Sequence, residues 1–134
     1  RSGHCFSLVL ADIDYFKSFN DRHGHDCGDY VLKEVSKLIT ENLRAQDQVA
    51  RWGGEEFLLL LPETEIEGGL EAAEKIRNTL EEKTFTYEGQ SLSVTMTFGV
   101  KDCQCNESID QCINAADMAL YKGKEAGRNR VAAG

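Results

Sequence analysis

Proline occurs once in the 134 residues, at Pro62, and there is no low-complexity run, so we do not expect a disordered segment. No stretch approaches the roughly 20 apolar residues of a membrane-spanning helix, so we expect no membrane contact within this chain. Basic residues are scarce too: 15 Lys and Arg face 23 Asp and Glu, for a formal net charge of −8. An acidic domain repels a phosphate backbone, so we expect no nucleic-acid partner.

The five cysteines are Cys5, Cys27, Cys103, Cys105 and Cys112, and they include no C-x-x-C pair. We expect free thiols, as is typical of a reducing cytosol. A metal site formed by Cys103, Cys105 and Cys112 is the alternative. Cys112 falls on the apolar face of a predicted helix, which favours a place in the core.

Strand-like and helix-like segments alternate along the chain. Apolar runs predict strands at residues 6–12, 48–52, 56–61, 85–87, 90–100 and 130–132. Apolar residues three and four positions apart predict helices from about Val31 to Arg44, from Ile66 to Leu80, and from Ile109 to Leu120, with Gly127 after the last. The polar segment 14–29 is interpreted as a connection. This order predicts one α/β domain over residues 1–134, with a mixed central sheet flanked by helices in a ferredoxin-like plan.

Three features can carry chemistry. Asp12 ends a buried strand, where a rigid carboxylate suits Mg²⁺; the alternative is an Asp that caps the next helix. Gly53 and Gly54 predict a tight hairpin, because Gly accepts the positive φ of such turns. Two glutamates follow it, pointing to opposite faces of the strand and so suited to different tasks, unless the hairpin is only a solvated acidic loop.

The third feature is a pair of cations, Lys124 and Arg128, near the end of the last predicted helix. At positions i and i+4 they share one helix face, where they can grip a triphosphate. The alternative is that they only complement the helix dipole.

Four strings, DIDYFK at 12–17, NDRHGHDCGD at 20–29, RWGGEEF at 51–57 and GRN at 127–129, together resemble the GGDEF family of diguanylate cyclases. The resemblance extends over roughly residues 6–132, and the signature has the GGEEF form. It implies a nucleotidyl-cyclase-type βαββαβ fold with additions. Family members usually begin with a D-x-L-T-G-L-x-N-R stretch, which this chain lacks, so we expect a domain trimmed at its N-terminus.

The resemblance also implies roles for individual residues. Mg²⁺ or Mn²⁺ is held by Asp12, the carbonyl of Ile13, and Glu55, while Glu56 serves a second metal or the attacking hydroxyl. Asn20 and Asp29 read guanine, since a carboxylate accepts from a donor edge that adenine lacks. The remaining nucleotide contacts implied are His25, the phosphate-binding turn at Phe16 and Lys17, and the phosphate-gripping Lys124 and Arg128.

The implied reaction joins two GTP molecules into cyclic di-GMP, with two pyrophosphates released and a homodimer required. An upstream sensory domain is the expected regulator, and the expected location is cytoplasmic, with any membrane anchor in absent regions. Arg44 and Asp47 resemble the R-x-x-D product-inhibition site, with Lys75 where an arginine is usual. The alternatives are a catalytically silent cyclic di-GMP receptor and a different nucleotidyl cyclase of related fold; Asn20 with Asp29 argues against the latter.

Overall fold

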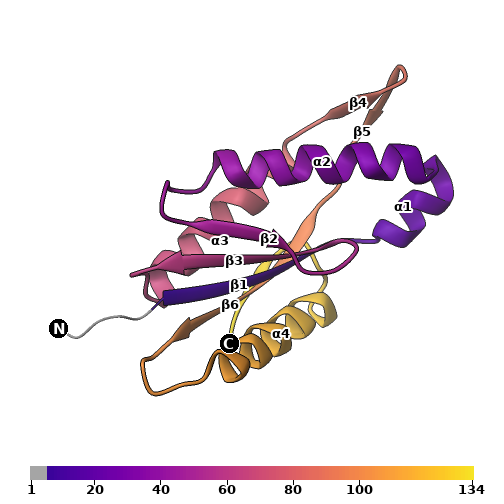
Figure 1. Ribbon diagram of the computed structural model, residues 1–134. Coiled ribbons are helices and arrows are strands. Elements are labelled where there is room, and N and C mark those ends of the chain that lie inside the picture. Colours follow the sequence, from indigo (N-terminus) through magenta and orange to yellow (C-terminus); the bar gives the residue numbers. More distant parts are fainter. Residues whose placement is uncertain (1–5) are drawn as a thin grey trace.

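The computed structural model describes residues 6–134 and contains a five-stranded mixed sheet in the order β2-β3-β1-β6-β7 (Figure 1). Only β6 and β7 are parallel neighbours; the other pairs are antiparallel. The elements are β1 (Phe6–Ile13), α1 (Phe16–His23), α2 (His25–Glu41), β2 (Gln48–Arg51), β3 (Glu56–Pro62), α3 (Ile66–Glu81), β4 (Phe85–Tyr87), β5 (Gln90–Leu92), β6 (Met96–Cys103), α4 (Ile109–Glu125) and β7 (Val131–Ala133). The predicted mixed α/β fold is confirmed.

Helices cover both faces of the sheet. Alternate residues of β1 point to opposite faces. Val9 and Ala11 pack in the larger core with α2 and α3, whereas Leu8 and Leu10 pack against α4. Figure 1 shows α4 on the other side of the sheet from α2 and α3. The same alternation puts Asp12 on the α4 face.

The polar segment 14–29 contains a helix that the sequence pattern did not predict. Of the residues in α1, only Phe16 is buried, so the helix has almost no apolar stripe. Gly24, with φ of 91°, separates α1 from α2. The left-handed region is one that glycine enters at little cost, so the chain turns sharply there between two helices. Helix α2 begins earlier than the predicted Val31, at His25, and ends earlier than the predicted Arg44, at Glu41. The Asn42 side chain donates to the Leu38 carbonyl at 2.8 Å and so satisfies one carbonyl of the last turn.

The single strand predicted at 90–100 is two strands. β5 pairs with β4 in a separate two-stranded sheet, while β6 joins the main sheet. Leu92, Val94, Met96 and Phe98 are all buried, so the side-chain alternation continues through the break. What changes at the break is the strand to which this segment is hydrogen-bonded, and the alternation of side chains does not indicate which strand that is.

Two further expectations were wrong in detail. Neither Gly53 nor Gly54 has a positive φ, although the hairpin between β2 and β3 forms as predicted. Cys103 and Cys112 are joined as a disulfide, with Cα atoms 5.8 Å apart, rather than being free thiols or ligands of one metal. Cys112 is buried as predicted, and within residues 6–134 the free thiols are the buried Cys27 and the exposed Cys105. Cys5 lies outside the described residues.

Candidate active site

Two acidic segments meet at one edge of the sheet. Asp12 faces Glu56 across the β1–β3 pairing, and the Ile13 N–H donates to the Glu55 carbonyl at 3.3 Å. The side chains of Asp12 and Glu55, together with Ile13, line one cavity of about 190 Å³. The carboxylates at the end of β1 and after the glycine hairpin are therefore neighbours.

The charges of this cavity are only partly balanced. Burial raises the pKa of both Glu55 and Glu56; the charge of Asp12 raises them further, while Lys124 lowers them. Lys124 Nζ pairs with Asp12 Oδ2. The second oxygen, Asp12 Oδ1, is buried and has no hydrogen-bond partner among residues 6–134. A buried carboxylate oxygen without a partner is costly unless a cation or a donor arrives.

The residues here fit a divalent metal. Two carboxylates and a neighbouring carbonyl are hard oxygen donors, and Mg²⁺ commonly takes one or two protein carboxylates and completes its shell with water and phosphate oxygens. No group of three or more His, Cys, Asp or Glu side chains able to hold a metal occurs in the described part of the chain. The donor set therefore suits a metal that shares its coordination with a phosphorylated ligand.

Basic side chains and the start of helix α1 line the same cavity. Phe16 and Lys17 are the first residues of α1, where backbone N–H groups have no partner within the helix and can bind an anion. Tyr15, in the left-handed conformation, precedes them. Lys124 and Arg128 also line the cavity.

Arg128 reaches the cavity by a route that differs from the predicted one. Helix α4 ends at Glu125, so Arg128 does not share a helix face with Lys124. The Gly127 N–H bonds the Lys124 carbonyl at 3.3 Å, and the Arg128 N–H bonds the Gly123 carbonyl at 3.0 Å. These two bonds form a Schellman C-cap with Gly127 at the left-handed position. The Arg128 guanidinium lies over the Tyr15 ring, 4.7 Å from its centre.

The residues expected to read guanine lie on α1 and α2. Asn20 is half-buried on α1, and its Oδ1 has no hydrogen-bond partner within residues 6–134. A Cβ added at Gly28 would stand 1.8 Å from that oxygen, so Asn20 packs directly on the residue before Asp29. Asp29 and His25 are exposed on α2. Asn20 thus carries a buried acceptor without a partner among the described residues, and it packs on the residue that precedes Asp29.

A second cavity, of about 290 Å³, brings together Arg44, Asp47 and Lys75. The Arg44 guanidinium bonds Asp47 at 2.8 Å, and its Nη2 also donates to Pro62 O at 3.0 Å and Thr64 Oγ1 at 2.8 Å. The hydrogen bond to Asp47 raises the pKa of Arg44. The planar guanidinium is therefore held at the mouth of a cavity that a second cation, Lys75, also lines.

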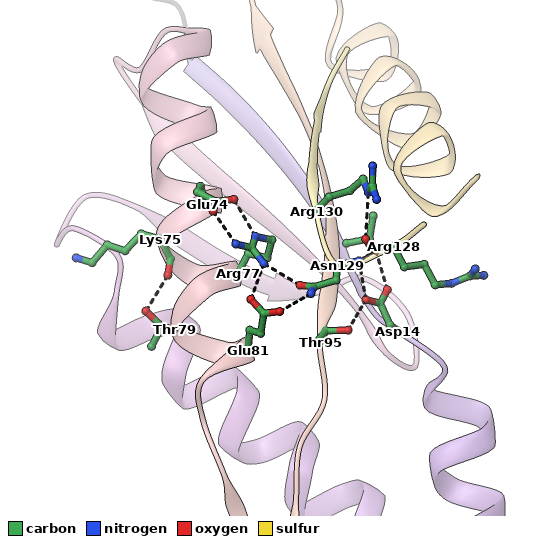
Figure 2. Close-up of polar contacts among 11 residues, drawn as sticks. Asp14, Glu74, Lys75, Arg77, Thr79, Glu81, Thr95, Arg128, Asn129 and Arg130 are labelled. Carbon is green, nitrogen blue, oxygen red and sulfur yellow. Dashed lines mark hydrogen bonds and ion pairs between the residues drawn. The ribbon is translucent and has the colours of Figure 1, made fainter. Parts of the chain in front are cut away.

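Sequence reasoning assigned no role to Asp14 or Asn129. Asp14 is buried, and its carboxylate accepts from Thr95, Thr97 and the Asn129 N–H (Figure 2). These partners lie between 81 and 115 residues away in the chain. The sequence offered one signal for a role: Asp14 belongs to the DIDYFK string and Asn129 to the GRN string. The spacing of the two strings does not show that the two residues touch.

The comparisons with known proteins decide the family. The family model described as "Diguanylate cyclase, GGDEF domain" matches residues 1–130. The chain belongs to the GGDEF family. Diguanylate cyclase A of Treponema denticola is 44% identical over 126 residues, which are 93% of this chain and 34% of that protein. The chain thus spans about a third of the length of this curated relative.

Solved GGDEF domains have the same fold. The GGDEF domain of DgcB from Caulobacter crescentus, in complex with c-di-GMP, has a TM-score of 0.93 and 33% identity, covering 98% of this chain and 78% of that one. The active GGEEF domain of a diguanylate cyclase from Vibrio cholerae has a TM-score of 0.89 and 34% identity, covering 97% and 83%. Within residues 6–134, no helix of the GGDEF domain is long and apolar enough to span a membrane.

Proposed function

We propose that this GGDEF domain is a diguanylate cyclase that condenses two GTP molecules into cyclic di-GMP and two pyrophosphates. The observation that carries the proposal is the cavity that Asp12 and Glu55 share with the cations Lys124 and Arg128, in which one Asp12 carboxylate oxygen has no partner among the described residues. Carboxylates and cations that line one cavity suit a metal–triphosphate complex. A silent receptor would not need this arrangement.

In the proposed complex, Asp12, the carbonyl of Ile13, and Glu55 hold Mg²⁺ or Mn²⁺, which when bound lowers the pKa of a coordinated hydroxyl and neutralises phosphate charge. The first backbone N–H groups of α1, at Phe16 and Lys17, cradle the phosphates.

The outer groups complete nucleotide binding. Lys124 and Arg128 neutralise the triphosphate and hold it in the cavity. Asn20 and Asp29 hydrogen-bond the guanine edge, and His25 lies near the nucleotide. A site that places a buried acceptor against the donor edge of guanine disfavours adenine.

The bond changes are those of in-line phosphoryl transfer. The 3′-oxygen of one GTP bonds to the α-phosphorus of the other, the bond from that phosphorus to the pyrophosphate oxygen breaks, and the 3′-hydroxyl proton departs. Glu56 is suited to accept that proton, because burial and the charge of Asp12 raise its pKa. Since each domain binds one GTP, two copies must face one another, and upstream regulatory domains control that pairing.

The test uses the domain fused to a dimerising partner, incubated with GTP and either Mg²⁺ or Mn²⁺, with the nucleotides separated by chromatography. We expect cyclic di-GMP and pyrophosphate in a 1:2 ratio. Glu55→Gln should abolish the product yet remain folded, while Glu67→Gln, the same change on an exposed residue of α3, should not. Absence of product from the unmodified fusion, together with retained binding of cyclic di-GMP, would refute the cyclase and favour the receptor.

The Arg44 cavity is proposed as a product-inhibition site. A guanidinium can bond phosphate in a bidentate manner and stack on guanine. Lys75 supplies a second positive charge but lacks the planar fork, so inhibition by cyclic di-GMP should occur with reduced affinity.

A further inference from the structure

Asn129 is held through its backbone N–H and through both polar atoms of its side-chain amide. Its backbone N–H donates to Asp14 Oδ2 at 3.0 Å and to Thr97 Oγ1 at 3.1 Å. Its side-chain Nδ2 donates to Glu81 at 2.7 Å, and its Oδ1 accepts from Arg77 at 2.9 Å. Figure 2 shows the side chain of Asn129 extending toward α3 and its backbone beside Asp14. One residue thus joins α3, β6 and the segment after β1.

The α3 end of this arrangement is rigid. The Arg77 guanidinium makes two bonds to Glu74, at 2.8 and 2.7 Å, and a third to Glu81 at 3.0 Å. The Arg77 side chain is only 14% exposed, and these bonds raise its pKa. A bidentate, partly buried Arg–carboxylate pair is a strong and directional anchor. The donor offered to Asn129 is therefore fixed in space.

Both carboxylate oxygens of Asp14 already accept hydrogen bonds from the protein. Thr97 occupies Oδ1 at 2.7 Å, and Thr95, also at 2.7 Å, shares Oδ2 with the Asn129 N–H. Asp12, in contrast, keeps an oxygen without a partner among the described residues. Although the two aspartates are two positions apart, Asp12 remains available for a cation and Asp14 is used to hold the chain.

These contacts also restrain Arg128, the residue that precedes Asn129. Both residues have left-handed backbone conformations, with φ of 63° for Arg128 and 47° for Asn129. Asn enters this conformation more readily than most residues, but an arginine in it persists only where the surroundings hold it. The conformation directs Arg128 over Tyr15 and into the cavity of Asp12.

We propose that Asn129 is a positioning residue: held by Arg77 and Glu81 through its amide and by Asp14 through its backbone, it fixes Arg128 to contact the triphosphate of GTP. This inference rests on the proposed function, since it assumes that GTP binds in this cavity. It assigns Arg77 and Glu81, which lie outside the cavity, to the support of phosphate binding.

The first test is Asn129→Ala, assayed in the dimerised fusion and by equilibrium binding of GTP and GMP. Loss of the amide frees Arg128 to leave its orientation. We expect the KM for GTP to rise about tenfold, the size of one lost charge-assisted contact, with a smaller change in kcat. Binding of GMP, which lacks the β- and γ-phosphates, should change less than twofold. Equal losses for GTP and GMP would mean a general structural defect and would overturn the proposal.

The second test reverses one hydrogen bond. Asn129→Asp places a carboxylate against Glu81, so we expect the KM for GTP to rise at least as far as in Asn129→Ala. Adding Glu81→Gln restores a donor and an acceptor with their polarity exchanged, while Arg77 still has an acceptor at position 129. The double variant should return to within about twofold of the unmodified KM. Failure of this rescue in a variant that unfolds at the unmodified temperature would overturn the proposal.

The third test is a double-mutant cycle with Arg128→Ala. Because Asn129 acts through Arg128, Asn129→Ala should add less than about twofold to the KM of Arg128→Ala. Effects that multiply would show independent roles and overturn the proposal. If the unmodified fusion makes no cyclic di-GMP, the proposed function fails separately, and the GTP and GMP binding comparison still tests Asn129.

Discussion

Gly28→Ala should separate nucleotide recognition from stability. A Cβ at this position would stand 1.8 Å from Asn20 Oδ1 and 2.9 Å from its Cγ, so the amide must retreat by about 1 Å or more. The Asn20 atoms that have to move are the end of a flexible side chain, and the buried Phe16 ring, whose Cζ would stand 3.3 Å away, must give by only a few tenths of an ångström, so the steric cost is small. Alanine within helix α2 also gains roughly 0.5–1 kcal/mol over glycine. We therefore expect a free energy of unfolding equal to or above that of the unmodified domain.

The functional cost should appear in guanine binding. If the Asn20 amide makes one hydrogen bond to guanine, its loss is worth about 0.5–1.5 kcal/mol, which is roughly a 2- to 12-fold rise in the KM for GTP. Initial rates with GTP give the KM, urea unfolding gives the stability, and competition by ATP reports base selectivity. Asn20→Ala is the matched control, and combining it with Gly28→Ala should change the KM no further. An unchanged KM and selectivity in a folded Gly28→Ala variant would refute the assignment of Asn20.

Three further outcomes can be measured on the same protein. Burial, and to a smaller extent the charge of Asp12, raises the pKa of Glu55 and Glu56. As pH is lowered, the cyclase rate should therefore begin to fall at a higher pH than it would if both carboxyl groups had the ordinary glutamate pKa. The metal-free folded domain binds protons at Glu55 and Glu56 more readily than the unfolded chain, whereas Glu74, Glu81 and Glu107, with lowered pKa values, act in the opposite direction. The thermal stability of the unmodified domain, relative to that of a Glu55→Gln, Glu56→Gln variant, should therefore rise as pH is lowered toward the ordinary glutamate pKa; a relative stability that falls would contradict the assignment. Gly99→Ala places a Cβ 2.1 Å from a carbonyl oxygen of α4, and urea unfolding should show a loss of about 1–3 kcal/mol. Lys75→Arg should lower, several-fold, the concentration of cyclic di-GMP that halves the rate, since it supplies the planar fork; an unchanged value would argue against a ligand in that cavity.

The larger elements could be predicted from the sequence because their apolar spacing is regular. Val31, Val35, Leu38 and Ile39 are all buried along α2, as their spacing predicts. Helix α1 was missed because a short helix with one buried residue carries almost no such pattern. The division of segment 90–100 was missed because hydrogen-bond partners, unlike side-chain alternation, are set by distant parts of the chain.

The candidate site shows the same limit. Family strings predicted Asp12, Glu55, Lys124 and Arg128, and the structure gathers them in one cavity. The reason offered for the last two was incomplete, since a Schellman cap rather than a helix face directs Arg128. The contacts of Asp14 could not be predicted at all, because each partner is more than 80 residues away and no local pattern encodes that distance.

Helix α3 belongs to two neighbourhoods at once. Lys75 lines the cavity of Arg44, and two positions later Arg77 leaves the helix in another direction to bond Asn129. Any rotation or sliding of α3 that improves one set of contacts must disturb the other. Substitutions at Lys75 or Arg77 can therefore affect both sets of contacts, and a variant selected for altered feedback should be checked for altered substrate affinity before either change is credited to the residue replaced.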